Sequence, residues 1–374
     1  MLSGDNYDFS SSCNYSCNYP NVLVFFASTK RYNKFMLKKT SKRKSFNEQV
    51  FRLFSLPKFL QIPAVGFDIS DKSIKFLEIL SDRKKTMVGK FGKEKLPAGA
   101  VESGRIVNQD KIVEKLRAIR DKNGFKYIRA SLPEEKTYLF ETKLSGVNSD
   151  NIENTIEFQL EEHVPLSPKD ALFDYDIVSN QNQGEAGVVV SVLPKVVVSR
   201  YVETFEMAGM VPAVLETEAQ TIARAVVPKE DKRTFIVVDF GFSRTGISLV
   251  DESLVKFTST VQIGGNSITA AIAKNMRQDF RAAELVKKDQ GLIGIRKNEK
   301  LFTEVMEILD NLVNEIEKHK RYWQEIGSGD REKRKLQIEG IFLCGGEANL
   351  KGLSQYLDSK IDLRVKIANV WNNI

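Results

Sequence analysis

Apolar and polar positions follow the same order at two distant places in the chain. At Val65–Lys75 and again at Phe235–Thr245, an apolar run ends in an aspartate, and a turn of small and polar residues leads toward a second apolar run. This pattern predicts a β-hairpin at each place. The turn of such a hairpin can present backbone N–H groups and a hydroxyl to an anion, and the carboxylate beside it can hold hydrated Mg²⁺. One such hairpin is ordinary turn chemistry, but two predict a cleft that holds the phosphate tail of a nucleotide from both sides.

A third apolar strand, Ile341–Cys344, runs directly into the glycine pair Gly345 and Gly346. Glycine has no Cβ, so a flat base or a ribose can approach the backbone closely at such a pair. The order of these three signals resembles that of actin-like ATPases, which are built from two ribonuclease-H-like domains. We therefore expect an α/β protein with a duplicated core.

The segment after the first hairpin is consistent with one ribonuclease-H-like half. Apolar patterns predict strands at Thr86–Lys95 and Tyr127–Leu132 and an amphipathic helix at Asp110–Lys122 between them. Residues 97–104 predict a loop, because proline and glycines interrupt the pattern there.

The next segment departs from actin and predicts a small inserted α/β subdomain over residues 136–186. Its expected elements are strands at Thr137–Leu144 and Ala171–Val178 with a helix at Ser149–His163 between them. A valine-rich strand at Val188–Leu193 is expected to return the chain to the first core. The second half begins with the Phe235 strand and is expected to contain helical stretches at Asn266–Asp289 and Glu299–Glu325.

Charge is distributed unevenly along the 374 residues. Residues 1–61 contain ten Lys/Arg and three Asp/Glu, which accounts for the whole net charge of +7. The body is therefore neutral, and the basic balance gives no reason to expect nucleic-acid binding. Three cysteines do not make a disulfide framework, and Cys13 and Cys17 lack further metal ligands nearby. No apolar run reaches the ~18 residues of a membrane span, so we expect a cytoplasmic body.

The N-terminal arm combines a basic cluster at residues 38–44 with an aromatic helical stripe. Phe46, Val50 and Phe54 recur at helical spacing, and Pro57 ends this predicted helix. Such a helix can lie on an anionic membrane surface or pack on the body, and the sequence leaves both readings open. Met36 opens a second candidate start of translation, so the sequence does not decide whether residues 1–35 are made.

Residues 63–374 resemble PilM, the actin-like family of type IV pilus assembly, which is related to the division protein FtsA. Besides the hairpins, the resemblance rests on these segments: residues 96–101 (LPAGAV), residues 157–168, Asp174-Tyr175, residues 208–212 (AGMVP) and residues 262–266 (QIGGN). The resemblance implies an actin-like ATPase fold of two ribonuclease-H-like domains with an FtsA-like inserted α/β subdomain. The expected parts are a basic, aromatic and partly disordered arm (1–62), a first domain (63–135 and 187–230), the inserted partner-binding subdomain (136–186), a second domain (231–265 and 337–374) and a helical subdomain that closes the nucleotide cleft (266–336).

The resemblance also implies ATP and Mg²⁺ as cofactors and assigns roles to matching positions. Asp68 and Asp239 would hold Mg²⁺ through water from opposite sides. The other implied nucleotide contacts are Ser70, Lys75, Gly241, Arg244, Thr245, Gly264, Gly265, Glu284, Lys287, Gly345 and Gly346. Glu218 lies near the position at which actin-like hydrolases orient the attacking water.

Several of these roles have an equally simple structural reading. Lys75 is either a neighbour of the phosphates or only a strand residue. Glu284 and Lys287 match a ribose-contacting pair, but i/i+3 Glu–Lys pairs are common on any helix. Ser70 replaces the glycine usual in the first turn, and its Cβ lies where the backbone should approach phosphate most closely. We therefore expect nucleotide binding to survive and hydrolysis to be slow at most.

Other catalytic constellations are absent from the sequence. The residues after Gly246 do not complete a Walker A loop. Only two histidines occur, His163 and His319, and we expect both at helix ends or on the surface. This leaves neither a zinc site nor a Ser-His-Asp triad.

The leading functional hypothesis is an ATP-binding scaffold, peripheral at the cytoplasmic face of the inner membrane. The resemblance implies that its inserted subdomain binds the tail of a PilN-type membrane protein, with self-association and membrane contact through the arm as further expectations. Two alternatives stay open: an FtsA-like division protein and an actin-fold phosphotransferase. The sequence does not show whether ATP is hydrolysed, which pilus, secretion or DNA-uptake system is served, or which oligomer forms.

Overall fold

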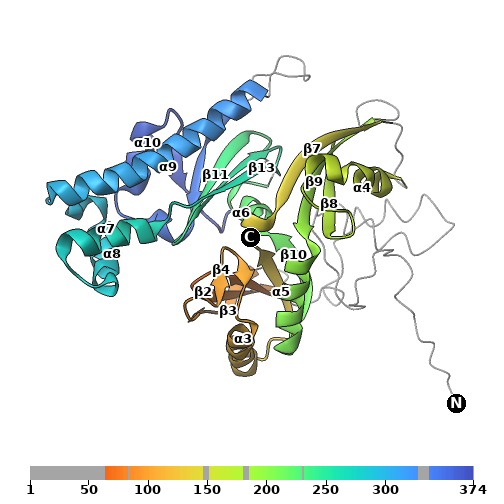
Figure 1. The fold of residues 1–374 in the computed structure, drawn as a ribbon, viewed down its shortest axis with the longest axis horizontal. Coiled ribbons are helices and arrows are strands. Elements are labelled where there is room, and N and C mark those ends of the chain that lie inside the picture. Colours follow the sequence, from red (N-terminus) through yellow and green to blue (C-terminus); the bar gives the residue numbers. More distant parts are fainter. Residues whose placement is uncertain are drawn as a thin grey trace. The chain divides into compact units, whose positions relative to one another are not determined.

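The computed structural model describes residues 64–82, 85–145, 151–179, 185–229, 231–326 and 337–373 (Figure 1). The chain divides into two compact units. Of the described residues, the first unit comprises those of 64–102, Ile106–Ser131 and Val196–Glu216, and the second comprises those of Ser103–Arg105, Leu132–Lys195 and 217–373. The aromatic helix expected in the arm lies outside the described residues.

The first unit contains a five-stranded sheet in the order β10-β6-β1-β2-β3. Its strands are β1 (Val65–Ile69), β2 (Ser73–Asp82), β3 (Lys85–Lys95), β6 (Tyr127–Leu132) and β10 (Val211–Thr217). β1 pairs antiparallel with β2 and parallel with β6. The predicted hairpin and the strands expected after it are therefore confirmed. The stretch expected as a loop (97–104) contains β4 (Val101–Glu102), which pairs with β5 (Arg105–Ile106) just after this stretch. The turn residues of this small hairpin, Ser103 and Gly104, both have positive φ.

Two helices of the first unit are α3 (Gln109–Asn123) and α5 (Lys195–Met207). The side chain of Asn108 caps the start of α3, and Gly124 ends it with a φ of 76°. These local signals explain why the predicted helix is confirmed to within one residue at each end. The core contains a group of aromatic rings in mutual contact: Phe67, Phe76, Phe125 and Phe205.

The AGMVP segment (residues 208–212) has a structural role in the first unit. It ends α5 and enters β10, and Gly209 takes a φ of 75° at this point. Arg117 and Arg120 of α3 donate hydrogen bonds to the backbone oxygens of Met207 and Ala208 at 2.8 and 2.6 Å. The similarity of this segment to the PilM family therefore reflects, in part, how the C-terminal end of α5 is held against α3.

The second unit contains a sheet in the order β13-β12-β11-β14-β15. Its strands are β11 (Thr234–Phe240), β12 (Thr245–Asp251), β13 (Leu254–Val261), β14 (Ile338–Cys344) and β15 (Val365–Ile367). β11 pairs antiparallel with β12 and parallel with β14. The two sheets have the same strand order, since β11, β12 and β13 correspond to β1, β2 and β3, and β14 and β15 correspond to β6 and β10. The duplication expected from the sequence is therefore confirmed.

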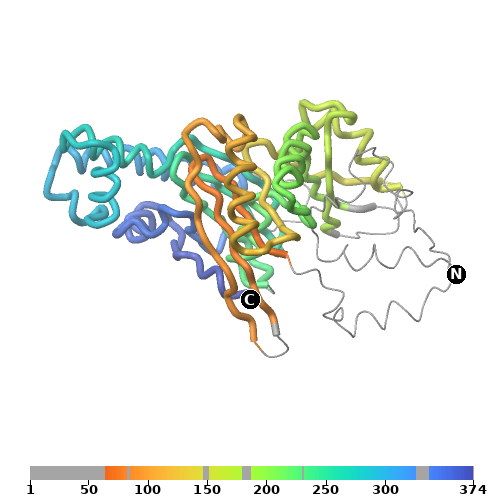
Figure 2. The backbone as a smooth tube through the Cα atoms, turned by 90° about the horizontal axis from the view of Figure 1, so that it is seen from below, coloured from red at the N-terminus to blue at the C-terminus, as the bar shows by residue number. Residues whose placement is uncertain are grey.

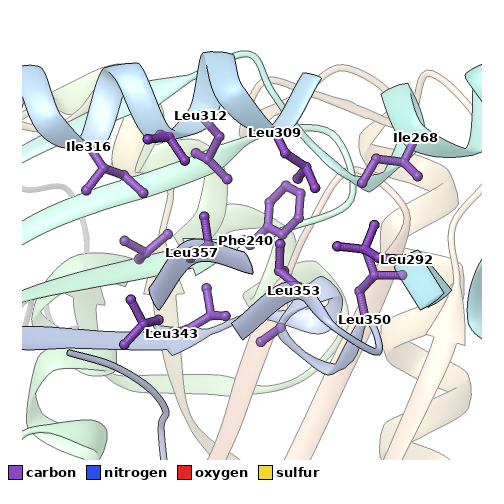
Figure 3. Close-up of a cluster of buried hydrophobic side chains, with 14 of the residues drawn as sticks. Phe240, Ile268, Leu292, Leu309, Leu312, Ile316, Leu343, Leu350, Leu353 and Leu357 are labelled. Carbon is purple, nitrogen blue, oxygen red and sulfur yellow. The ribbon is translucent and has the colours of Figure 1, made fainter. Parts of the chain in front are cut away.

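One face of the second sheet packs against helices around a large apolar core (Figure 3). Figure 3 shows Leu309, Leu312 and Ile316 of one helix pointing toward Phe240 and Leu343 of the sheet. The helices of this part are α7 (Gly265–Met276), α8 (Phe280–Ile295), α9 (Glu299–Ile326) and α10 (Leu353–Lys360), with the short η3 (Gly346–Asn349) before α10.

The helical stretch expected at Asn266–Asp289 is in fact two helices. Arg277 takes a left-handed φ of 51° and ends α7, and the side chain of Asp279 caps the start of α8. The sequence signal for this break was Asp279, a residue type that favours the N-cap of a new helix. It was overlooked because the helical periodicity is strong on both sides of it.

The segment between β6 and α5, which belongs to the second unit, forms a three-stranded sheet in the order β7-β9-β8 with one helix. Its elements are η2 (Glu134–Lys136), β7 (Tyr138–Ser145), α4 (Ile152–His163), β8 (Ala171–Ser179) and β9 (Glu185–Pro194). The expectation that Val188–Leu193 returns to the first core was wrong, because β9 pairs with both β7 and β8. A run of valines fits any buried strand, so the sequence could not identify the sheet that it joins. Tyr175 of the Asp-Tyr pair is buried in this subdomain's own core.

Candidate nucleotide site

The first of the two predicted hairpins belongs to the first unit. Asp68 in β1 lies directly opposite Lys75 in β2, and Lys75 Nζ donates to Asp68 Oδ2 at 2.7 Å. Ser131 Oγ of β6 donates to the other carboxylate oxygen of Asp68 at 3.4 Å. Asp68 is therefore held between two neighbouring strands, and Lys75 lies on the same face of the sheet as this carboxylate.

Ser70 closes the first turn upon itself. Both its backbone N–H and its hydroxyl donate to the carbonyl oxygen of Ser73, at 3.0 and 3.1 Å. The serine thus rigidifies the turn from inside, which a glycine at this position would do with its N–H alone.

The second predicted hairpin, in the second unit, is hydrogen-bonded to the glycine loop that follows β13. Gly241 N–H donates to the carbonyl oxygen of Arg244 at 3.0 Å and closes the turn. Gly265 N–H donates to the carbonyl oxygen of Gly241, also at 3.0 Å. A Cβ at Gly264 would lie 2.4 Å from the Phe242 carbonyl oxygen, so only glycine lets the loop pack this closely on the turn.

Thr245 and Arg244, at the end of this turn, both have partners in the second unit. Thr245 is fully buried, and its hydroxyl donates to the carbonyl oxygen of Ile263 at 2.6 Å, which fixes the glycine loop to β12. Arg244 forms an ion pair with Glu135 of η2, and both side chains are largely buried. The turn between β11 and β12 is therefore linked directly to the segment that leads into the inserted sheet.

Glu284 and Lys287 form the centre of a buried charge cluster. Lys287 Nζ lies 2.9 Å from Glu284 Oε2 and 2.8 Å from Glu347 Oε2, and it donates to the carbonyl oxygen of Gly265 at 3.1 Å. The Lys287 side chain is only 1% exposed. Its charge is compensated by two carboxylates, as a buried ammonium requires. The i/i+3 pair is thus part of a three-way contact between α8, the glycine loop and η3, and not an ordinary surface pair.

Charge and hydrogen bonding keep Glu284 ionised. Burial acts to raise the pKa of Glu284, but the Thr269 hydroxyl, which donates at 2.7 Å, and the neighbouring Lys287 and Lys288 outweigh it. Together they lower the pKa to about 2. Glu284 therefore stays ionised throughout the physiological range.

The glycine pair after β14 lies beside Asp239. Gly345 has a φ of 90°, and a Cβ there would come within 2.4 Å of Asp239 Oδ1. A Cβ at Gly346, in contrast, would meet nothing within 4 Å. Gly345 is thus required by the packing of the strand end, and Gly346 leaves open space in front of the backbone.

Glu218 is the first residue of α6 (Glu218–Val226) and is partly exposed. The start of this helix is held by Glu134, whose Oε2 accepts a hydrogen bond from the Ala219 N–H at 2.9 Å. Burial raises the pKa of Glu134 to about 7, and this hydrogen bond only partly opposes it. A cavity of about 320 Å³ adjoins this place and is lined by Glu134, Glu135, Thr137, Thr258, Ser259, Thr260 and Gln262.

The structure brings the predicted residues of the second unit together: Asp239, Gly241, Arg244, Thr245, Gly264, Gly265, Glu284, Lys287, Gly345 and Gly346. Asp68, Ser70 and Lys75 form a separate group in the first unit, and the expectation that both groups face one cleft concerns the arrangement of the units and stays a prediction. Sequence reasoning did not assign roles to Glu347, Thr269 and Glu135. Glu347 follows the glycine pair directly, which was its only signal.

The two histidines lie in different environments. His163 ends α4, as expected, and its ring stacks on Phe140 at 4.2 Å. His319 was wrongly expected at a helix end or on the surface, because it lies inside α9 and packs against Phe257. Burial lowers the pKa of His319, so it is a neutral packing residue at physiological pH.

None of the described helices is long and apolar enough to cross a membrane.

Known proteins resemble this chain over most of its length. Cell division protein FtsA of Enterococcus hirae is 24% identical over 347 residues, which covers 81% of this chain and 77% of that protein. FtsA of Streptococcus pneumoniae is 22% identical over 342 residues, with coverage of 81% and 74%. The solved structure of a PilM–PilN type IV pilus biogenesis complex contains a chain that matches with a TM-score of 0.70 at 20% identity, covering 84% of this chain and 90% of that one.

The structural match confirms the actin-like fold expected from the sequence. The family model described as type IV pilus assembly protein PilM matches residues 66–374, which include both sheets and the inserted subdomain. The chain therefore belongs to the PilM family of type IV pilus assembly proteins.

Proposed function

We propose that this protein binds ATP with Mg²⁺ and uses the bound state to control its contact with a membrane-protein tail in type IV pilus assembly. The observation that carries the proposal is the charge cluster of Lys287, Glu284 and Glu347 beside the two glycine segments. A lysine with 1% exposure and two carboxylate partners is costly to bury. This cluster offsets the free-energy cost of burying a charge by holding α8, η3 and the glycine loop in one fixed geometry.

The residues of the second unit fit a nucleotide. Gly346 leaves space in front of the backbone, as a flat base or a ribose requires. The turn closed by Gly241 and the loop at Gly264 and Gly265 bring backbone segments close together without intervening side chains. We assign the ribose side of the site to Glu284 and Lys287, and the phosphate side to the turn at Gly241–Arg244.

Asp239 and Asp68 would hold the Mg²⁺ ion through water molecules, and the ion would neutralise charge on the phosphate tail. Lys75 already neutralises part of the Asp68 charge at 2.7 Å. Ser70 uses its hydroxyl within the turn, so this hydroxyl would have to leave Ser73 to reach a phosphate. These contacts support binding with slow hydrolysis at most, in which Glu218 would orient water.

The inserted subdomain is the proposed site for a PilN-type tail, since a chain of the same fold has been solved in a PilM–PilN complex. A tail that belongs to an inner-membrane protein would place this protein at the cytoplasmic face of that membrane. Self-association and contact of the basic arm with the membrane are further parts of the proposal.

Calorimetric titration of Mg-ATP into the full chain tests the proposal. The variant Asp239→Asn keeps the shape of the side chain and removes the charge, so we expect ATP affinity to fall by about tenfold or more. Asp362→Asn, an exposed change in the same unit, serves as the control and should bind as the wild type does.

Absence of binding heat in the wild type at millimolar ATP would contradict the nucleotide part of the proposal. The partner part has a separate readout, the fluorescence polarisation of a labelled PilN-type tail peptide. Binding of the peptide without any nucleotide binding would leave a scaffold that has kept only the actin-like shape.

A further inference from the structure

The hairpin of β2 and β3 extends beyond the rest of the first sheet. β1 pairs with β2 only up to Leu77, whereas the pairs between β2 and β3 continue to Asp82 and Lys85. Past Leu77, each strand of the hairpin therefore pairs with a single neighbour among the residues that the structure describes. Figure 2 shows these two strands in orange, running side by side away from the sheet.

The extended part of this hairpin exposes apolar side chains on both of its faces. Ile79 lies opposite Val88, and Leu80 lies opposite Met87. Their exposed fractions are 44%, 46%, 45% and 53%. Neighbouring residues of a strand point to opposite faces, so the two pairs lie on opposite sides of the hairpin.

A β-bulge adds a further apolar residue to one face. Gly89 and Lys90 together oppose Glu78, and the backbone N–H of Lys90 donates to Glu78 Oε2 at 3.0 Å. The extra residue shifts the alternation, so Phe91 lies on the same face as Val88. Phe91 is 72% exposed, and this face thus carries Ile79, Val88 and Phe91 in a row.

The same strand is basic. β3 contains four lysines, Lys85, Lys90, Lys93 and Lys95, against the single acid Glu94. Lysines on an edge strand prevent pairing with other strands, which explains their presence on β3. That role does not explain the two exposed apolar pairs, since a protective edge needs no apolar side chains on either face.

We propose that the β2–β3 hairpin inserts its apolar pairs into an anionic lipid surface. A flat protein surface can cover only one face of a two-stranded hairpin, whereas a lipid interface surrounds both faces at once. Lys85, which lies next to the apolar pairs, would then lie at the level of the negatively charged headgroups, where a basic residue strengthens binding. Lys90 does not take part, because its ammonium donates to the Asn123 carbonyl oxygen at 2.6 Å. This contact is distinct from the proposed nucleotide and tail sites and does not use the arm.

Flotation of the full chain with vesicles of equal parts phosphatidylcholine and phosphatidylglycerol tests the proposal. The double variant Leu80→Ser/Met87→Ser removes one apolar pair at exposed positions, so its folding should be unaffected. We expect about tenfold weaker binding to the vesicles. The matched control is Leu285→Ser/Ile293→Ser on α8, where the side chains are 63% and 71% exposed. The control should float as the wild type does.

A local probe separates the hairpin from the arm. The variant Phe91→Trp should give an emission shift with these vesicles and should be quenched by brominated lipids beyond the response of the native Trp323 and Trp371. Equal flotation of the Leu80→Ser/Met87→Ser variant and the wild type, with no quenching of the introduced tryptophan, would overturn the proposal. A dimer in solution that this double variant converts to a monomer, with unchanged flotation, would overturn it in favour of a second copy of the chain.

Discussion

Glu134 shows how a single buried group can set a pH dependence. Burial raises its pKa from 4.5 to about 7, because the charged form is poorly solvated there. A carboxyl whose folded pKa is raised binds its proton more tightly in the folded state. Its contribution to stability is therefore fully present below pH 4.5 and is lost as the pH rises toward 7.

The variant Glu134→Gln should remove this loss, since glutamine imitates the protonated carboxyl and can still accept the Ala219 N–H. The difference in free energy of unfolding between the variant and the wild type should shift by roughly 3 kcal/mol in favour of the variant as the pH rises from 4.5 to 8. Urea unfolding followed by tryptophan fluorescence measures this gain, because Trp323 and Trp371 both lie in the second unit together with Glu134. Glu161→Gln, an exposed change, is the control. Parallel pH curves for wild type and Glu134→Gln would contradict the prediction.

At the scale of elements, the junction of β14 and η3 separates two functions of glycine. Gly345 has a φ of 90° and no room for a Cβ, so its role is to let the strand turn beside Asp239. Gly346 has room for a Cβ in front of it. One glycine therefore serves the fold, and the other is available to a ligand.

Alanine at each position should separate these roles. Gly345→Ala should destabilise the second unit by about 1–3 kcal/mol, because it adds backbone strain and a steric clash. Gly346→Ala should leave stability unchanged and weaken ATP binding by about tenfold, because the methyl group occupies the space reserved for the nucleotide. Urea unfolding and calorimetry measure the two effects. Unchanged ATP affinity in Gly346→Ala would place the nucleotide elsewhere.

At the scale of the whole molecule, the ion pair of Arg244 and Glu135 joins the two proposed activities. Arg244 belongs to the turn that we propose holds phosphate, and Glu135 lies in η2, three residues before β7 of the inserted sheet. A second ion pair, between Lys256 of β13 and Glu141 of β7 at 3.5 Å, also connects the second sheet to the inserted sheet. A change at the phosphate turn therefore has a direct mechanical path to the proposed tail site.

We expect Mg-ATP to change the affinity for a PilN-type tail peptide by about tenfold, and the peptide must change ATP affinity by the same factor. Glu135→Gln should reduce this coupling while each ligand still binds alone. Peptide titrations with and without Mg-ATP measure the effect, with Glu161→Gln as the exposed control. Full coupling in Glu135→Gln would show that the ion pair does not transmit it.

Local signals made much of the fold predictable. The helix α3 is bounded by Asn108 and Gly124, and the first hairpin follows from one aspartate and a small turn. The break between α7 and α8 was missed because one N-cap residue competed with strong helical periodicity on both sides. The strand β9 was placed in the wrong sheet for a different reason, since its valines satisfy any buried strand.

The site was predictable to the extent that its residues stand in short segments with recognisable turns. Asp239, Gly241 and Gly345 could be found in this way, because hairpin turns and glycine pairs are features of neighbouring residues. Glu135 and Glu347 could not be assigned, since each acts through a partner far away in the chain. Glu135 pairs with Arg244, and Glu347 pairs with Lys287, and no local pattern joins such residues.

By itself, the sequence determined the duplicated α/β core, its two hairpins and the family, because each depends on periodicity, turn chemistry or motifs within a few residues. Only the tertiary structure decided that Lys287 is a buried junction, that Thr245 fixes a loop and that β9 belongs to the inserted sheet. It also decided that the β2–β3 hairpin leaves apolar pairs uncovered. Burial and pairing depend on which surfaces meet in space, and residues distant in the chain supply those surfaces.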